Sequence, residues 1–75
     1  MELNQILILQ GKTRHGKNRV NEQGALWRIV GIRPALPHSR FPVGTMTLEL
    51  ESVEGDYWRI ISANGDQDFE FFPAD

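Results

Sequence analysis

Cysteine is absent from this sequence of 75 residues, and long hydrophobic runs are absent as well. Without cysteine the chain can form no disulfide framework, no thiolate metal site and no cysteine nucleophile. The longest purely apolar run is Ile6 to Leu9, far shorter than the roughly 20 residues that a membrane-spanning helix needs. No charged-then-apolar leader opens the chain. We therefore expect a cytoplasmic protein that has no contact with a membrane.

Groups that carry catalytic chemistry are also sparse. His15 and His38 are the only histidines, and they do not have the spacing of a zinc site. Asn64, Asp66 and Asp68 lie close together but lack the twelve-residue ligand pattern of a calcium loop. A chain this short has little room for a deep substrate cleft. We therefore expect no catalytic residue, metal, cofactor or small-molecule substrate, and no enzyme activity.

The residues that are present predict one folded domain over residues 1–75. Hydrophobic residues make up 40% of the chain and charged residues 24%, an ordinary balance for a globular protein. Short apolar runs separated by Gly, Pro and Asn are typical of strands. We expect five strands, which lie near residues 2–10, 25–32, 45–52, 57–63 and 68–72. The predicted fold is all-β, a small five-stranded antiparallel barrel or strongly bent sheet, with long loops at 11–24 and 33–44.

The last two strands predict a specific hairpin. Asn64-Gly65 is typical of a tight two-residue turn. Counting outward from it places Ile60 opposite Phe69, Arg59 opposite Glu70, Trp58 opposite Phe71 and Tyr57 opposite Phe72. The register predicts a core face made of Trp58, Ile60, Phe69 and Phe71. It also predicts an outer face that carries an Arg59–Glu70 ion pair and a Tyr57–Phe72 aromatic pair. The aromatic pair is either a candidate binding platform or a cross-strand pair that another part of the chain covers.

The preceding turn allows two registers. A two-residue loop at Glu54-Gly55 would place Glu51 opposite Trp58 and Glu49 opposite Ile60. A three-residue loop, 54–56, places Leu50 opposite Ile60 and Glu51 opposite Arg59. We expect the three-residue loop, because the other would set carboxylates beside the predicted core.

Charge is divided unevenly along the chain. Residues 1–40 carry seven cations and two anions, and residues 41–75 carry one cation and eight anions. The two halves could neutralise each other, or the basic half could face a polyanion. The second alternative centres on the segment 12–19 as a nucleic-acid or anion contact. Its candidate residues are Lys12, Arg14, His15, Lys17 and Arg19.

The first strand has apolar residues on both faces. Ile6 and Ile8 alternate with Leu7 and Leu9, so each face of this strand needs cover. In a chain this small, a partner subunit is an expected source of the second cover. Ile6 and Ile8 are therefore candidate protein contacts.

The segment Glu54-Gly55-Asp56-Tyr57-Trp58-Arg59, followed by Phe72-Pro73, resembles the Src-homology-3 family. The resemblance covers residues 45–75 and implies a small β-barrel in which residues 2–10 supply a missing strand. It also implies that Tyr57 and Pro73 line a groove for a peptide. The family's opening Ala-Leu-Tyr-Asp-Tyr segment is absent, and its acidic first loop is basic here. We therefore carry over the architecture and not the binding of proline-rich peptides.

A shorter segment, Gly24-Ala25-Leu26-Trp27 with Ile29-Val30-Gly31, is similar to the small plasmid-type dihydrofolate reductases. Their active-site strand is replaced here by 68–71, so only the barrel pattern is carried over. We expect a non-enzymatic adaptor that acts through protein contacts, as a homo-oligomer, at Tyr57, Phe72, Pro73, Ile6 and Ile8. The alternative is a nucleic-acid-binding barrel that uses the 12–19 segment.

Overall fold

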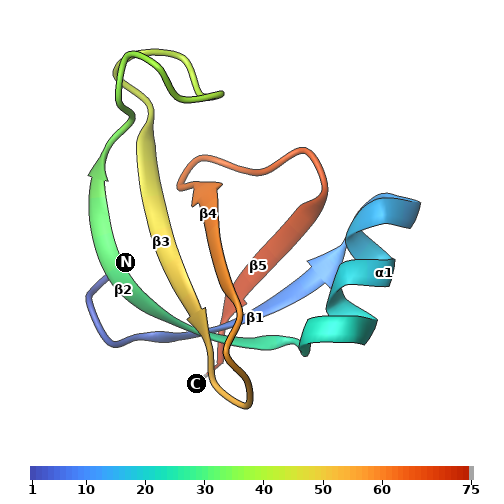
Figure 1. Cartoon of the computed structure of the whole chain (residues 1–75). Helices are drawn as coiled ribbons and strands as arrows, with labels where there is room; N and C mark the ends of the chain where they lie inside the picture. The colour runs from blue at the N-terminus through green and yellow to red at the C-terminus, as the bar shows by residue number, and fades with distance from the viewer. Residues whose placement is uncertain (75) are drawn as a thin grey trace.

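The computed structural model describes residues 1–74, and Asp75, the last residue of the predicted domain, lies outside them. The described residues form five strands and one helix (Figure 1). These are β1 (Ile6–Gly11), α1 (Arg14–Gln23), β2 (Leu26–Pro34), β3 (Met46–Ser52), β4 (Trp58–Ser62) and β5 (Phe69–Pro73). All strands belong to one antiparallel sheet in the order β4-β3-β2-β1-β5. The prediction of an all-β, five-stranded antiparallel fold is confirmed.

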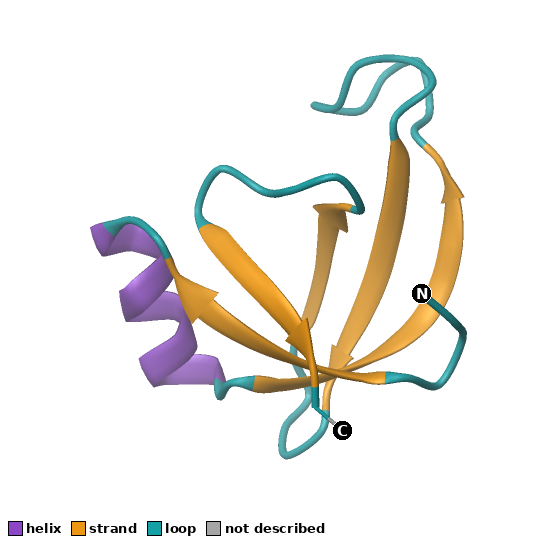
Figure 2. Cartoon of the chain, turned by 180° about the vertical axis from the view of Figure 1, so that it is seen from behind, coloured by secondary structure: helices purple, strands orange, loops and turns teal. Residues whose placement is uncertain are grey.

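The sheet is strongly bent, and the core lies inside the bend (Figures 1 and 2). β2 carries an irregularity between Ile29 and Gly31, and such an extra residue increases the local bend and twist of a strand. Over residues 1–74, β4 and β5 do not pair with each other. The barrel is therefore not closed.

The core takes at least one residue from every strand. Its members are Leu7, Leu9, Trp27, Ile29, Leu48, Leu50, Ile61 and Phe69. Burial of each such side chain stabilises the fold by roughly 1.5–3 kcal/mol. The indole of Trp27 remains hydrogen-bonded, because its Nε1 donates to the carbonyl oxygen of Gly24 at 3.1 Å.

The expected loop at 11–24 is wrong, because residues 14–23 form α1. The Thr13 hydroxyl accepts from the Gly16 amide and caps the start of the helix, and Gly24, at φ 91°, ends it. Gly16 is buried so tightly that an added Cβ would lie 2.0 Å from the carbonyl oxygen of Asp68. Sequence periodicity missed this helix because Val20 is its one large apolar residue.

The predicted hairpin between the last two strands is also wrong. β5 pairs with β1, with Leu9 opposite Phe71 and Ile8 opposite Phe72. A turn does form next to the predicted position, but its central residues are Ala63 and Asn64, because the Gly65 amide donates to the carbonyl of Ser62. The chain then continues to β5 without returning along β4. Pairing with β5 gives β1 a hydrogen-bonded neighbour on its second edge, which a local turn signal cannot reveal.

The register of β3 and β4 is the one that the sequence argument rejected. Leu50 lies opposite Arg59, Glu51 opposite Trp58 and Glu49 opposite Ile60. Ile61 therefore enters the core, and Trp58 is 63% exposed. Of the predicted core face, Phe69 is buried while Ile60 and Phe71 are half-buried. The prediction failed because this strand has apolar residues in both alternation phases, and the phase chosen was the wrong one.

Candidate functional site

The outer face of the sheet carries a row of apolar side chains across three adjacent strands. Register places Phe72 of β5 beside Ile8 of β1, and Ile8 beside Leu26 of β2. Phe72 is 43% and Leu26 37% exposed, and Ile8 and the neighbouring Ile6 are half-buried. We call Ile6, Ile8, Leu26 and Phe72 the outer-face patch. It joins three of the predicted contact residues on one surface.

The other two predicted protein contacts lie elsewhere. Tyr57 lies in the turn before β4 and is exposed, and Pro73 pairs with Leu7 at the end of β5. The predicted Tyr57–Phe72 cross-strand pair is wrong, because Phe72 lies opposite Ile8. The structure therefore separates Tyr57 from the outer-face patch, which contains Phe72.

A groove borders the outer-face patch where α1 passes beside β1. Its volume is about 460 Å³. The lining is mainly apolar, with one cation and no carboxylate, and comprises Ile8, Leu9, Gln10, Gly11, Lys17, Val20, Asn21 and Ala25. We call it the helix groove. Sequence reasoning missed it because one of its walls is the unexpected helix.

The β3–β4 turn, which lies at the bottom of Figure 1, carries a second set of exposed apolar side chains. Residues 53–57, which we call the hairpin tip, are all exposed. They combine two large apolar side chains, Val53 and Tyr57, with the carboxylates of Glu54 and Asp56. Trp58 follows directly on the outer face. Aromatic side chains such as Tyr57 and Trp58 are enriched in the parts of protein surfaces that bind other proteins.

The basic segment is distributed around the start of α1. Lys12 donates from Nζ to the carbonyl of Asp66, and Arg19 pairs with Glu22 at 3.1 Å. Arg14, His15 and Lys17 are exposed on the helix. The acidic half approaches closely here, because the Thr13 hydroxyl donates to the Asp68 carboxylate. Within residues 1–74, neither Arg14 nor Lys17 makes an ion pair.

Charge pairing between the halves is observed on the outer face, in a different pattern from the predicted one. Arg28 pairs with Glu51 at 3.2 Å, and Arg33 pairs with Glu49 at 2.9 Å. The Glu49 carboxylate occupies the space where a Cβ on Gly31 would lie. The predicted Arg59–Glu70 pair is wrong, because Arg59 points to the inner face.

Arg59 is the polar exception among the inner-face residues. Its guanidinium lies 4.4 Å from the centre of the Phe69 ring, and Nη2 donates to Gln23 at 3.1 Å. Burial lowers the pKa of Arg59, while the nearby Asp66 carboxylate opposes that shift. Its Nε is buried without a hydrogen-bond partner among the described residues. This arginine closes part of the gap between β4 and β5 by packing on an aromatic ring.

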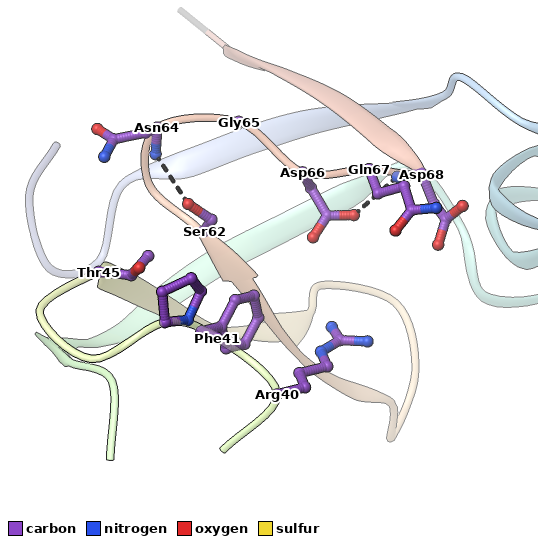
Figure 3. A pocket seen from close by; sticks show the side chains of 10 residues that line it. Arg40, Phe41, Thr45, Ser62, Asn64, Gly65, Asp66, Gln67 and Asp68 are labelled. Carbon is purple, nitrogen blue, oxygen red and sulfur yellow. Dashed lines mark hydrogen bonds between the residues drawn. The ribbon is translucent and has the colours of Figure 1, made fainter. Parts of the chain in front are cut away.

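A cleft of about 380 Å³ lies between the 35–45 loop and the 63–68 loop (Figure 3). Sequence reasoning did not locate this cleft. Its charged groups are used within the fold: Arg40 donates to the Ile60 carbonyl, and Asp66 accepts from the Asp68 amide. These bonds help to hold the two loops in place.

Residues 1–74 contain no group of three or more His, Asp or Glu side chains placed to hold a metal ion. In the same residues, no helix has the length and apolar character needed to cross a membrane. In comparisons with known proteins, no family model, no curated protein and no solved structure matches this chain.

Proposed function

We propose that this protein is a non-enzymatic binding module that acts through protein contacts and associates with copies of itself in the cytoplasm. The observation that carries the proposal is the outer-face patch. Phe72, Ile8 and Leu26 form one apolar row on the face opposite the core. Contiguous exposed apolar surface on a small soluble domain is typical of an interaction site.

The architecture proposed with this function is an Src-homology-3-like barrel. Two features support it. β1, within the predicted 2–10 strand, supplies a fifth strand of the sheet beside β5, and Phe72-Pro73 ends β5. A peptide groove lined by Tyr57 and Pro73 is part of this proposal. Within residues 1–74, β4 and β5 do not form the predicted hairpin between Tyr57 and Pro73.

The test is the oligomeric state of the purified chain, measured by light scattering coupled to size exclusion over a range of concentrations. We expect the wild-type chain to self-associate and the Ile8→Ser/Phe72→Ser variant to be monomeric. Val43→Ser is the matched control, because Val43 is apolar and 76% exposed but lies in the 35–45 loop. A wild-type chain that stays monomeric at its solubility limit would contradict the proposal.

The alternative function is nucleic-acid binding through Lys12, Arg14, His15, Lys17 and Arg19. Arg14 and Lys17 of α1 favour it, because both are exposed and neither makes an ion pair with any residue from 1 to 74. Titration with DNA and RNA at two salt concentrations tests it. Binding that weakens steeply with salt, and that an alanine variant of Lys12, Arg14, Lys17 and Arg19 abolishes, would support this function. The absence of binding at low salt would exclude it.

A further inference from the structure

We propose that the chain forms a two-fold symmetric dimer in which the hairpin tip of each copy docks into the helix groove of the other. This inference rests on the proposed function and deepens it. It names the two surfaces that meet between two copies. The helix groove shares Ile8 with the outer-face patch.

The two surfaces complement each other in chemistry. The helix groove offers apolar walls, including Ile8, Val20 and Ala25, with Lys17 as its one charged residue. The hairpin tip offers Val53 and Tyr57, flanked by Glu54 and Asp56. Apolar surface would therefore meet apolar surface, and a cation would meet carboxylates. Such complementarity favours one partner and one orientation over others.

The charged residues of the two surfaces do not form ion pairs within the described part of one copy. Within residues 1–74, the ion pairs are Arg19–Glu22, Arg28–Glu51 and Arg33–Glu49. Lys17, Glu54 and Asp56 belong to none of them. Lys17 comes from the basic half of the sequence, and the two carboxylates come from the acidic half. An interface between copies would pair the halves where the fold of one copy does not.

The position of the two surfaces fits a two-fold axis. The amide of Val53, in the hairpin tip, donates to the carbonyl of Leu26 at 3.0 Å. Leu26 follows directly after Ala25, which lines the helix groove. The hairpin tip and the helix groove therefore lie next to each other on one side of the molecule. A surface that carries both halves of a contact is self-complementary, as a symmetric dimer requires.

A polyanion is a less suitable occupant of this side of the molecule. Glu54 and Asp56 on the hairpin tip would repel phosphates, whereas they would attract Lys17 of a second copy. Nucleic-acid binding is therefore an outcome that would contradict the dimer at this surface.

Charge reversal tests the inference on the full chain. We expect Lys17→Glu alone and Asp56→Lys alone to raise the dimer dissociation constant on the order of a hundredfold, because each contact occurs twice in the dimer. An equimolar mixture of the two variants should form a heterodimer, since both contacts then join opposite charges. Arg14→Glu and Glu2→Lys are the matched controls, which make the same charge changes outside both surfaces and should dimerise like the wild-type chain.

Analytical ultracentrifugation reads the result, and the circular dichroism melt of each variant shows that it is folded. Dimers that persist in both single variants would overturn the inference while leaving the proposed self-association intact. Loss of dimers without recovery in the mixture would also overturn the hairpin–groove contact. A wild-type chain that is monomeric throughout would overturn the inference and the proposed function together. In that case, salt-sensitive DNA or RNA binding lost in Lys17→Glu would assign the surface to a polyanion.

Discussion

Leu7 and Leu9 on β1 are buried on the inner face, whereas Ile6 and Ile8 on the same strand are half-buried on the outer face. The four side chains are almost identical in chemistry. Those on the inner face pack against residues of the other strands of this chain, and those on the outer face form part of an exposed patch. The comparison teaches that one strand serves two purposes. Its inner face stabilises the monomer, and its outer face is available to a partner.

The largest expected difference separates two neighbouring residues of β1. Leu9→Ala should lower the free energy of unfolding by roughly 2–5 kcal/mol, because it leaves a cavity in the core. Ile8→Ala should lower it by about 1 kcal/mol or less, because its side chain is only half-buried. Urea denaturation of dilute, monomeric protein measures both values. Equal losses would contradict the division of β1 into two faces.

The closely packed interior extends to α1. There, a Gly→Ala substitution should lower the stability of the fold, which is the reverse of its usual effect in a helix. In most helices Gly→Ala stabilises by about 1 kcal/mol. Gly16→Ala should instead destabilise by roughly 1–3 kcal/mol, because its Cβ would collide with the backbone carbonyl of Asp68. Asn18→Ala, on the exposed side of α1, should be neutral or slightly stabilising. Thermal unfolding of the two variants distinguishes these outcomes, and a more stable Gly16→Ala protein would refute the close contact.

Arg59 sharpens the comparison, because it is a charge on the inner face. Gln23→Glu should raise the free energy of unfolding by about 1 kcal/mol at neutral pH, since a carboxylate can accept from both Nη2 and the unpartnered Nε. Arg59 would lower the pKa of the introduced carboxylate. The gain should be present above about pH 4.3, the usual pKa of Glu, and should disappear as the pH falls through the lowered value.

Urea denaturation at several pH values measures this effect, and Gln23→Ala is its control. That variant loses the hydrogen bond from Arg59 and should be less stable than the wild-type chain. If Gln23→Glu is no more stable than Gln23→Ala at neutral pH, the assigned geometry of Arg59 is wrong.

The smallest expected effect is on the outer face, at the Arg28–Glu51 ion pair. Both side chains are close to half exposed, so Glu51→Gln should change the free energy of unfolding by less than about 0.5 kcal/mol. Added salt should reduce even this difference. Denaturation curves at two salt concentrations provide the measurement. A loss as large as that of Leu9→Ala would show that the outer face also stabilises the monomer.

Local pattern was enough to locate the strands. Alternation at Leu48 and Leu50, and the apolar run at Ile6 to Leu9, predicted strands that the structure contains. Gly24 and Gly65 marked places where the chain changes direction, and both have positive φ values. The sequence also indicated that β1 needs cover on both faces. These features depend on short-range residue spacing, so they are accessible without knowledge of which segments meet.

Three features of the fold were determined by tertiary contacts. The apolar pattern of α1 is weak, and the helix forms because Gly16 packs closely against the backbone of Asp68 and Val20 packs against the core. β5 pairs with β1 because β1 has a second edge that β2 leaves unpaired, and no local signal identifies β5 as its partner. β4 places Ile61 inside and Trp58 outside because Ile61 lies opposite Leu48, on the core face of β3. Each of these three features depends on contacts between residues far apart in the sequence. The candidate docking surfaces lie between such segments, so they could be located only in the folded chain.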